Sequence, residues 1–256
     1  LLSATRYGFT VTVVSAGHSE TSQATWFETG LLDPTDWKAD WIQGRLVGGR
    51  RAMVPAPYFR RSFVVESKVV RARLYITALG VMDPSLNGHS LGTDELSPGW
   101  TDYRKRVRYL TYDVTEHLQQ GENVLGVAVG DGWYAGNVEW RGRQLYGDRP
   151  GLLAQLVVET EDGRVEVVSN GDWQHNYGPI VQADILMGEH HDYRLSFPGW
   201  DAPGFDASTW LPVETVEPNV GALLAYNCPP IRSVETLQPV SVKRIPTWPS
   251  DIYLVD

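Results

Sequence analysis

The stretch LYITALGVMDPSLNGHSLGTDELSPGWTDYRKRVRYLTYDVTEHLQQGENVLGVAVGDGWYAG, residues 74–136, decides the fold class. Its apolar runs are short, rich in Val, Tyr and Thr, and bounded by Gly, Asn or Asp, which is typical of β-strands. Residues 107–112 and 124–129 are predicted strands, and Asn87-Gly88 is a dipeptide expected in a tight hairpin turn. Only residues 114–120, which end before a glycine, are predicted to form a short helical turn.

The same pattern continues on both sides of this stretch. Further strands are predicted at residues 7–14, 58–65, 70–77, 152–160 and 165–169. Asp162-Gly163 predicts a hairpin between the last two of these strands. Several short strands at near-regular spacing, without alternating helices, favour a β-sandwich or jelly roll over βαβ units. The expected fold class is therefore all-β.

Three segments are predicted along the chain. Residues 1–33 hold one convincing strand, and because one strand cannot bury its own face, they are interpreted as the tail of a truncated upstream domain plus a linker. Residues 34–213 carry the main strand array and are expected to form the jelly roll. Residues 214–256 are proline-rich, with short strands at 240–244 and 252–255, and are interpreted as a linker and the beginning of a following β-domain.

Composition excludes several classes of function. The net charge of −9 disfavours binding to a phosphate backbone, so no nucleic-acid partner is expected. No apolar run approaches the roughly 20 residues that a membrane-spanning helix needs, so no membrane partner is expected. The first residues, LLSA, lack the basic start and apolar core of a signal peptide. The 10 Trp and 12 Tyr could either stack on sugar rings or build a sandwich core.

The first candidate site is the loop that begins at Asp94-Glu95 and continues to Trp100. Adjacent carboxylates on a loop offer hard oxygen ligands for calcium and could leave coordination positions for sugar hydroxyls. Trp100 would supply a stacking platform. The alternative is an exposed acidic turn followed by structural aromatic residues.

The second candidate site is the glycine-flanked segment around Asp131 and Trp133. Flanking glycines relax the backbone, so Asp131 could accept hydrogen bonds from vicinal hydroxyls while Trp133 packs on the sugar ring. Tyr134 and Asn137 belong to the same segment. The alternative is a β-bulge in which Asp131 bonds its own turn amides and Trp133 is buried. Downstream, Asp148 adds a possible calcium ligand, with a plain hairpin turn as the alternative.

The segment Gly188-Glu189-His190-His191-Asp192-Tyr193 invites a metal or acid–base interpretation. Adjacent histidines on a strand point to opposite faces, so they rarely chelate one zinc ion. Glu189 and Asp192 would allow a two-carboxylate glycosidase, but no further element of such a site accompanies them. A structural loop, or one at an interface with another domain, is the favoured interpretation.

Taken in order, these segments resemble the N-terminal region of bacterial α-L-rhamnosidases of glycoside hydrolase family 78. The resemblance rests on four stretches: WFETGLLDPTDWKADWI (26–42), the stretch 74–136 quoted above, YGDRPGLLAQLVVETEDG (146–163) and MGEHHDYRL (187–195). One departure is MDPSLNG, where the family more often has an aromatic and a charged residue before the Asn-Gly turn.

The resemblance implies a galactose-binding-like jelly roll, preceded by a partial immunoglobulin-like piece and followed by the start of another β-domain. In some members a related module binds L-rhamnose through calcium and is classed as carbohydrate-binding module family 67. Catalysis by inversion resides in a later (α/α)₆ barrel, so the resemblance implies a hydrolase parent and a non-catalytic fragment. The expected partners are L-rhamnose or rhamnoside glycans and the catalytic barrel of the same polypeptide.

Two residue sets follow from these interpretations. The expected sugar-binding residues are Asp94, Glu95, Trp100, Asp131, Trp133, Tyr134 and Asn137. The expected calcium ligands are Asp94, Glu95 and Asp148. A purely structural module that supports the barrel is the main alternative function, and a glycosidase in its own right is a further one.

Overall fold

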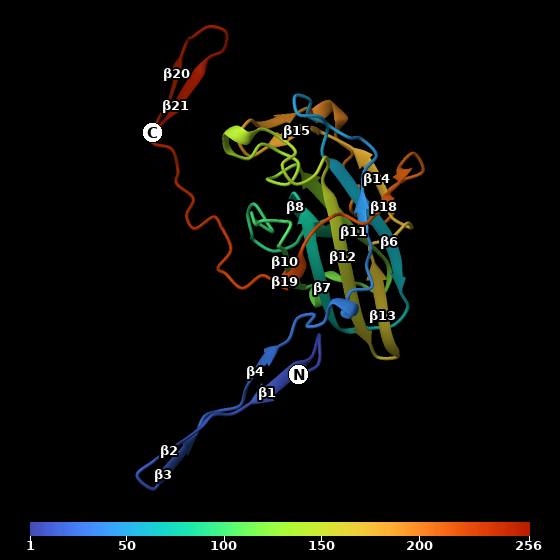
Figure 1. Cartoon of the computed structure of the whole chain (residues 1–256), viewed down its shortest axis with the longest axis vertical. Helices are drawn as coiled ribbons and strands as arrows, with labels where there is room; N and C mark the ends of the chain where they lie inside the picture. Colours follow the sequence, from blue (N-terminus) through green and yellow to red (C-terminus); the bar gives the residue numbers. More distant parts are fainter.

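Two β-sheets packed face to face form the body of the computed structural model, which describes all 256 residues (Figure 1). The all-β prediction is confirmed, because the only helical elements are four 3-10 turns. They are η1 (Pro34–Asp36), η2 (Thr115–His117), η3 (Glu139–Arg141) and η4 (Tyr193–Leu195). No helix has the length and apolar character needed to cross a membrane.

The first sheet has seven strands in the order β18-β5-β12-β7-β10-β19, with β13 also pairing β12. Every pairing in it is antiparallel except that of β10 with β19. The bounds are β5 (Trp41–Gln43), β7 (Val69–Leu79), β10 (Arg106–Asp113), β12 (Gly151–Thr160), β13 (Gly163–Val168), β18 (Glu214–Val216) and β19 (Ala222–Ala225).

The second sheet has six strands in the order β17-β14-β6-β11-β8-β9 and is antiparallel throughout. Its strands are β6 (Pro57–Val65), β8 (Val81–Leu86), β9 (His89–Ser90), β11 (Gly121–Gly130), β14 (Gln174–Tyr177) and β17 (Leu211–Pro212). A separate hairpin of β15 (Ile180–Asp184) and β16 (Gly188–His191) lies at one end of the sandwich (Figure 1).

The core between the two sheets arises from the period-2 alternation of the strands. On β7, Leu74 and Ile76 join the main apolar cluster, while Tyr75 between them belongs to a small cluster on the other face of the sheet. Trp173 closes the main cluster and satisfies its ring N–H by donating to the carbonyl of Val168 at 2.9 Å. The strand pattern therefore translates directly into the sandwich core.

The long predicted strands of the sandwich are confirmed, and both predicted hairpins form. Asn87 and Gly88 have φ of 53° and 80°, the left-handed pair that a tight turn between β8 and β9 requires. In the second hairpin Gly163 already pairs with Thr160, so the turn itself is Glu161-Asp162 and the glycine begins β13. The strands from β14 to β16 were not predicted, because they carry few β-branched residues.

The prediction of a single strand at residues 7–14 is wrong. The chain instead forms β1 (Arg6–Phe9), β2 (Thr12–Ser15), β3 (His18–Thr21) and β4 (Thr25–Glu28). Strand β1 pairs with β4, and β2 with β3, in one ribbon that projects from the sandwich (Figure 1). The ribbon thus pairs its strands within residues 1–33, while an upstream domain stays a prediction.

The predicted boundary at residue 213 falls inside the seven-stranded sheet. Strands β18 and β19 follow that boundary, and they form the two edges of the sheet by pairing with β5 and β10. Beyond them the chain leaves the sandwich and ends in a hairpin of β20 (Val242–Ile245) and β21 (Ile252–Val255) (Figure 1). These two strands agree with the prediction, and a following β-domain stays a prediction.

Candidate functional site

Three segments lie at the end of the sandwich where β15 is labelled in Figure 1, and the 91–105 loop joins them through the contacts of Trp100 with Trp133 and of Tyr103 with Tyr134; we call the four segments the rim. They are the loops at 44–56, 91–105 and 131–150 and the β15–β16 hairpin. The sheet registers bring them together, because Gly130 pairs with Val81 and Gly151 pairs with both Leu79 and Gln43. Loops on a rigid scaffold are the usual carriers of binding residues.

Trp100 and Trp133 form the main aromatic feature of the rim. Their rings are nearly parallel, with an angle of 8° between the planes and centroids 6.4 Å apart. Trp100 is 48% exposed, whereas Trp133 is half-buried against a small cluster that includes Leu79 and Tyr103. We call these two residues the indole pair. The pair presents aromatic surface to solvent, which suits stacking on the C–H face of a sugar ring.

Asp131 does not present its carboxylate to solvent. Its Oδ2 lies 2.5 Å from a guanidinium nitrogen of Arg143, and Arg143 also contacts Oδ2 of Asp184 at 3.1 Å. The three side chains are 4% exposed or less. The hypothesis that Asp131 accepts hydrogen bonds from sugar hydroxyls is therefore corrected, because Arg143 occupies its carboxylate. Neither Arg143 nor Asp184 is predicted as a site residue from the sequence. The only local signal for Arg143 is that it is an arginine in a loop.

Asn137 is also engaged inside the rim. Its backbone N–H and its side-chain amide both donate to Asp184, at 2.8 and 3.0 Å. Burial works to raise the pKa of Asp184, but hydrogen bonds from the backbone amides of Asn137, Leu186 and Met187 outweigh it and lower that pKa. At Asp131 burial dominates and raises the pKa, although Arg143 opposes this. Asn137 thus holds Asp184 rather than offering its amide to a ligand.

Tyr134 is a buried packing residue of the rim. It is 4% exposed and packs edge-on against Tyr103, with ring centroids 5.2 Å apart. Burial raises the pKa of its hydroxyl. Gly147 lies so close that a Cβ there would fall 2.1 Å from the Tyr134 ring. The predicted direct contact of Tyr134 with sugar is therefore corrected to a packing role.

The three expected calcium ligands do not form one centre. Asp94 accepts a 3.4 Å hydrogen bond from the hydroxyl of Tyr112 and forms an ion pair with Arg232, and its side chain is only 11% exposed. Glu95 is exposed, and its backbone N–H donates to the carbonyl of Ile231. Asp148 is exposed as well.

No group of three or more His, Cys, Asp or Glu side chains is close enough to hold a metal ion. Calcium prefers six to eight oxygen ligands, several of them carboxylate. The predicted ligands Asp94, Glu95 and Asp148 therefore do not converge on one calcium ion, and calcium binding stays a prediction.

Glu189 and Asp192 are likewise occupied by local partners. Glu189 lies 3.1 Å from a ring nitrogen of His191, and Asp192 caps η4 through the backbone N–H of Arg194. The side chain of Arg194 also donates to Asp192, and these bonds lower the pKa of that carboxyl. This segment is a local structural turn at the edge of the rim.

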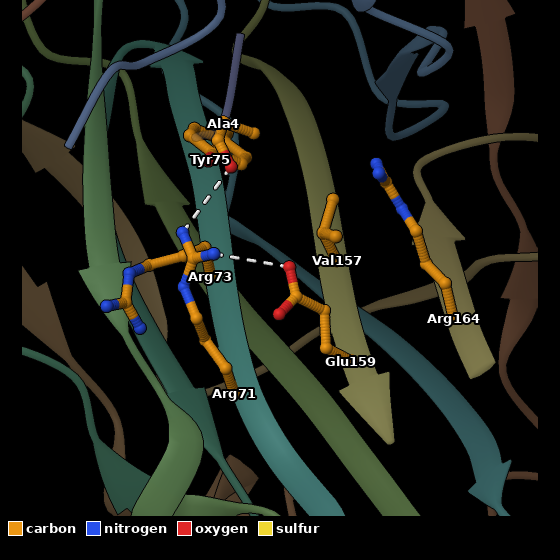
Figure 2. Close-up of a pocket in the computed structure, with 7 residues that line it drawn as sticks. All are labelled: Ala4, Arg71, Arg73, Tyr75, Val157, Glu159 and Arg164. Atoms are coloured by element: carbon orange, nitrogen blue, oxygen red, sulfur yellow. Dashed lines mark hydrogen bonds and ion pairs between the residues drawn. The ribbon is translucent and has the colours of Figure 1, made fainter. Parts of the chain in front are cut away.

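A cavity elsewhere on the molecule lies under the root of the N-terminal ribbon (Figure 2). Its volume is about 10 Å³, room for one water molecule and far too little for a sugar. Figure 2 shows Arg71 reaching the carbonyl of Ala4 on one side and Glu159 on the other. The hydroxyl of Tyr75 and the Nε of Arg71 are buried here without a hydrogen-bond partner.

The ribbon root is held to the sandwich by an ion-pair joint at the same place. Glu28 accepts hydrogen bonds from Arg73 at 2.8 and 3.0 Å and from Arg71 at 2.6 Å. All three side chains are at most 20% exposed. The hydroxyl of Tyr109 adds a bridge, since it accepts from the N–H of Leu31 and donates to its carbonyl. This region is a structural joint and not a binding pocket.

Comparison with known proteins identifies the family. Residues 67–235 match the family model described as the α-L-rhamnosidase N-terminal domain. The chain belongs to this family.

Known rhamnosidases resemble the chain in sequence over most of its length. An α-L-rhamnosidase of Streptomyces avermitilis is 54% identical over 156 residues, which cover 60% of this chain and 15% of that protein. One from Alteromonas sp. (strain LOR) is 36% identical over 236 residues, or 89% of this chain and 26% of that protein. The chain thus spans about a quarter or less of the length of these relatives.

Solved rhamnosidases share the fold closely. The crystal structure of the Streptomyces avermitilis enzyme complexed with L-rhamnose superposes with a TM-score of 0.88 at 27% identity, covering 95% of this chain and 40% of that one. The native enzyme from Aspergillus terreus gives a TM-score of 0.86 at 36% identity, covering 95% and 29%. The sandwich described above is therefore the rhamnosidase N-terminal fold, as the sequence resemblance predicted.

Proposed function

We propose that this chain is a non-catalytic accessory module of an α-L-rhamnosidase and that it binds L-rhamnose on the indole pair. The observation that carries the proposal is the parallel alignment of Trp100 with Trp133 at the rim. Family membership supports the rhamnoside class of ligand, and one solved relative is described as complexed with L-rhamnose. The parent protein would hydrolyse terminal α-L-rhamnosides in its catalytic barrel.

The chemistry of the ligand matches this surface. L-rhamnose is an uncharged 6-deoxy sugar, so its ring presents C–H groups and a methyl group that pack well on indole faces. It needs no cationic pocket, which agrees with the net charge of −9. A half-exposed aromatic surface of this kind is suited to weak, exchangeable binding that keeps an enzyme near its substrate.

The state of two rim carboxylates, Asp131 and Asp184, supports a non-catalytic role for this pair. Glycosidases of the two-carboxylate type need one acid and one base or nucleophile that are both free to reach the scissile bond. At the rim, Asp131 and Asp184 are both bound by Arg143 and excluded from solvent. Incubation of the chain with p-nitrophenyl α-L-rhamnoside should therefore release no p-nitrophenol, and turnover by the isolated chain would refute the non-catalytic assignment.

Isothermal titration calorimetry tests the binding proposal. L-rhamnose at millimolar concentration should give a saturable heat with the wild-type chain, in EDTA as well as in calcium, because the carboxylates do not converge on a metal. Absence of heat under both conditions would overturn the proposal. Binding that needs calcium would support the sugar ligand and overturn the metal-free mode.

A supporting role toward the rest of the polypeptide is the second candidate function. It is favoured by apolar side chains on the ribbon, where Phe9, Trp26 and Phe27 are 42%, 53% and 41% exposed. Exposed aromatic surface of this kind commonly marks an interface. The remainder of the parent protein, expressed without this chain, should then melt at a lower temperature. An unchanged melting temperature would count against this role.

A further inference from the structure

Arg143 contacts three of the four segments of the rim, although it belongs to only one of them. It bonds Asp131 at the start of its own loop, Asp184 at the end of β15, and the carbonyl of Gly49 at 3.4 Å in the 44–56 loop. The arginine is 6% exposed, so these contacts are made out of reach of bulk water. No other side chain in the rim joins three separate segments in this way.

We infer that Arg143 is the positioning residue of the sugar-binding rim: it holds the turn that carries Trp133 in register with the neighbouring loops. The inference rests on the proposed function, because it assigns a role in binding to a residue that touches no ligand itself. It concerns how the indole pair is kept in place.

The link from Arg143 to the indole pair passes through Asp131. Asp131 opens a tight turn that closes when the N–H of Ala135 donates to the carbonyl of Asp131 at 3.1 Å. Trp133 lies within this turn, directly after Gly132, whose φ of +51° is a left-handed conformation. A Cβ at Gly132 would meet the backbone of Gly80 at 2.8 Å, so the turn is closely packed. Fixing the carboxylate of Asp131 therefore fixes the direction in which Trp133 projects.

Arg143 is the only cation that balances the two buried carboxylates of Asp131 and Asp184 in this cluster. Two carboxylates share one guanidinium, and Asp184 is further satisfied by the backbone N–H groups of Leu186 and Met187 at 2.9 and 3.1 Å. Asp131 has no comparable set of amide donors. Removing the arginine would leave Asp131 as a buried carboxylate without a cationic partner, which must either take up a proton or reorient toward water. In both cases the ion pairs that tie the turn carrying Trp133 to the neighbouring segments are lost.

The ion pairs of Arg143 with Asp131 and Asp184 lie outside the core of the sandwich. Asp131 directly follows β11, Arg143 lies in the loop before β12, and Asp184 ends β15, which belongs to neither sheet of the sandwich. Substitutions here should therefore loosen the rim while the sheets stay folded. Arg164, a half-exposed arginine on β13 that pairs with Glu166, provides a surface control because it lies on the sheet and away from the rim.

The test uses four proteins: wild type, Arg143→Met, the double variant Asp131→Leu with Arg143→Met, and Arg164→Met. Hydrogen exchange and the melting temperature are measured without sugar, and L-rhamnose affinity by calorimetry. Arg143→Met should raise exchange at least tenfold in peptides covering 46–52, 131–137 and 184–188, leave β7 and β11 unchanged, and weaken rhamnose binding at least tenfold. Arg164→Met should match wild type in both measurements.

The double variant separates positioning from stability. Replacing both partners by apolar groups removes the uncompensated charge, so the melting temperature should recover while rhamnose binding stays at least tenfold weaker. Recovery of both, or faster exchange confined to residues next to 143, would overturn the inference. If wild type binds no rhamnose, the proposed function fails, yet the exchange data still decide whether Arg143 joins the three segments.

Discussion

Tyr75 and Tyr109 lie side by side on the outer face of the seven-stranded sheet, with ring centroids 6.3 Å apart, yet only the hydroxyl of Tyr109 has hydrogen-bond partners. Both rings are almost fully buried. The two tyrosines therefore share a packing environment and differ in whether the polar atom is satisfied.

This difference predicts opposite effects of the same substitution. Tyr109→Phe removes both bonds to Leu31 and should destabilise the chain by about 1–3 kcal/mol. Tyr75→Phe removes a buried hydroxyl with no partner and should be neutral, or stabilising by up to about 1 kcal/mol. Urea unfolding of the two variants measures the contrast. Equal losses of stability would show that the hydroxyl of Tyr75 is satisfied in solution.

His175 should make the stability depend on pH. Neither of its ring nitrogens has a hydrogen-bond partner, and burial, helped by the charge of Arg45, lowers its pKa from 6.5 to about 4. Below pH 6.5 the unfolded chain takes up a proton at His175, whereas the folded chain takes up this proton only near pH 4. The free energy of unfolding therefore decreases as the pH falls through that window. Between pH 7 and pH 5 this residue should cost about 2 kcal/mol of unfolding free energy.

Comparison with His175→Phe isolates this effect. The variant should lose about 2 kcal/mol less than wild type when urea unfolding is measured at pH 7 and then at pH 5. His18→Phe, at an exposed position of the ribbon, should leave the pH dependence unchanged. A wild type and a His175→Phe variant with parallel pH profiles would contradict the prediction.

Glu28 should control how firmly the ribbon is held to the sandwich. Glu28→Gln weakens the bonds to Arg71 and Arg73 and should cost about 1–2 kcal/mol at the joint. We expect faster proteolysis within residues 1–30 and faster hydrogen exchange at the ribbon root, with an unchanged sandwich. Glu20→Gln, an exposed position on β3, is the control. Equal protease resistance of the two variants would mean that the packing around Tyr109 holds the ribbon alone.

The indole pair should dominate sugar affinity. Trp100→Ala and Trp133→Ala should each weaken L-rhamnose binding about tenfold, equivalent to about 1.4 kcal/mol. Trp26→Ala provides the control, because Trp26 is exposed to a similar extent on the ribbon. Loss of affinity in the control alone would move the sugar site to the ribbon.

Much of the fold could be predicted from the sequence because the information is local. Alternation in β7, β11 and β12 defines the faces that pack together, and Asn87-Gly88 supplies the two positive φ angles of its turn. The ribbon was missed because its pairing joins β1 to β4 across an intervening hairpin. The parallel pairing of β19 with β10 also joins distant segments and leaves no local pattern.

The residues of the candidate site also fall into those that the sequence could predict and those that it could not. Glycine and aromatic residues at loop positions were enough to single out Trp100, Asp131 and Trp133 from the sequence. The sequence alone determined the all-β class, the main strands and the loops that carry aromatic residues, because each of these depends on neighbours along the chain. Only the tertiary structure decided that Trp100 meets Trp133 and that Asp131 faces Arg143 instead of solvent. The physical reason is that burial and charge pairing are set by which distant loops the sheet register brings together.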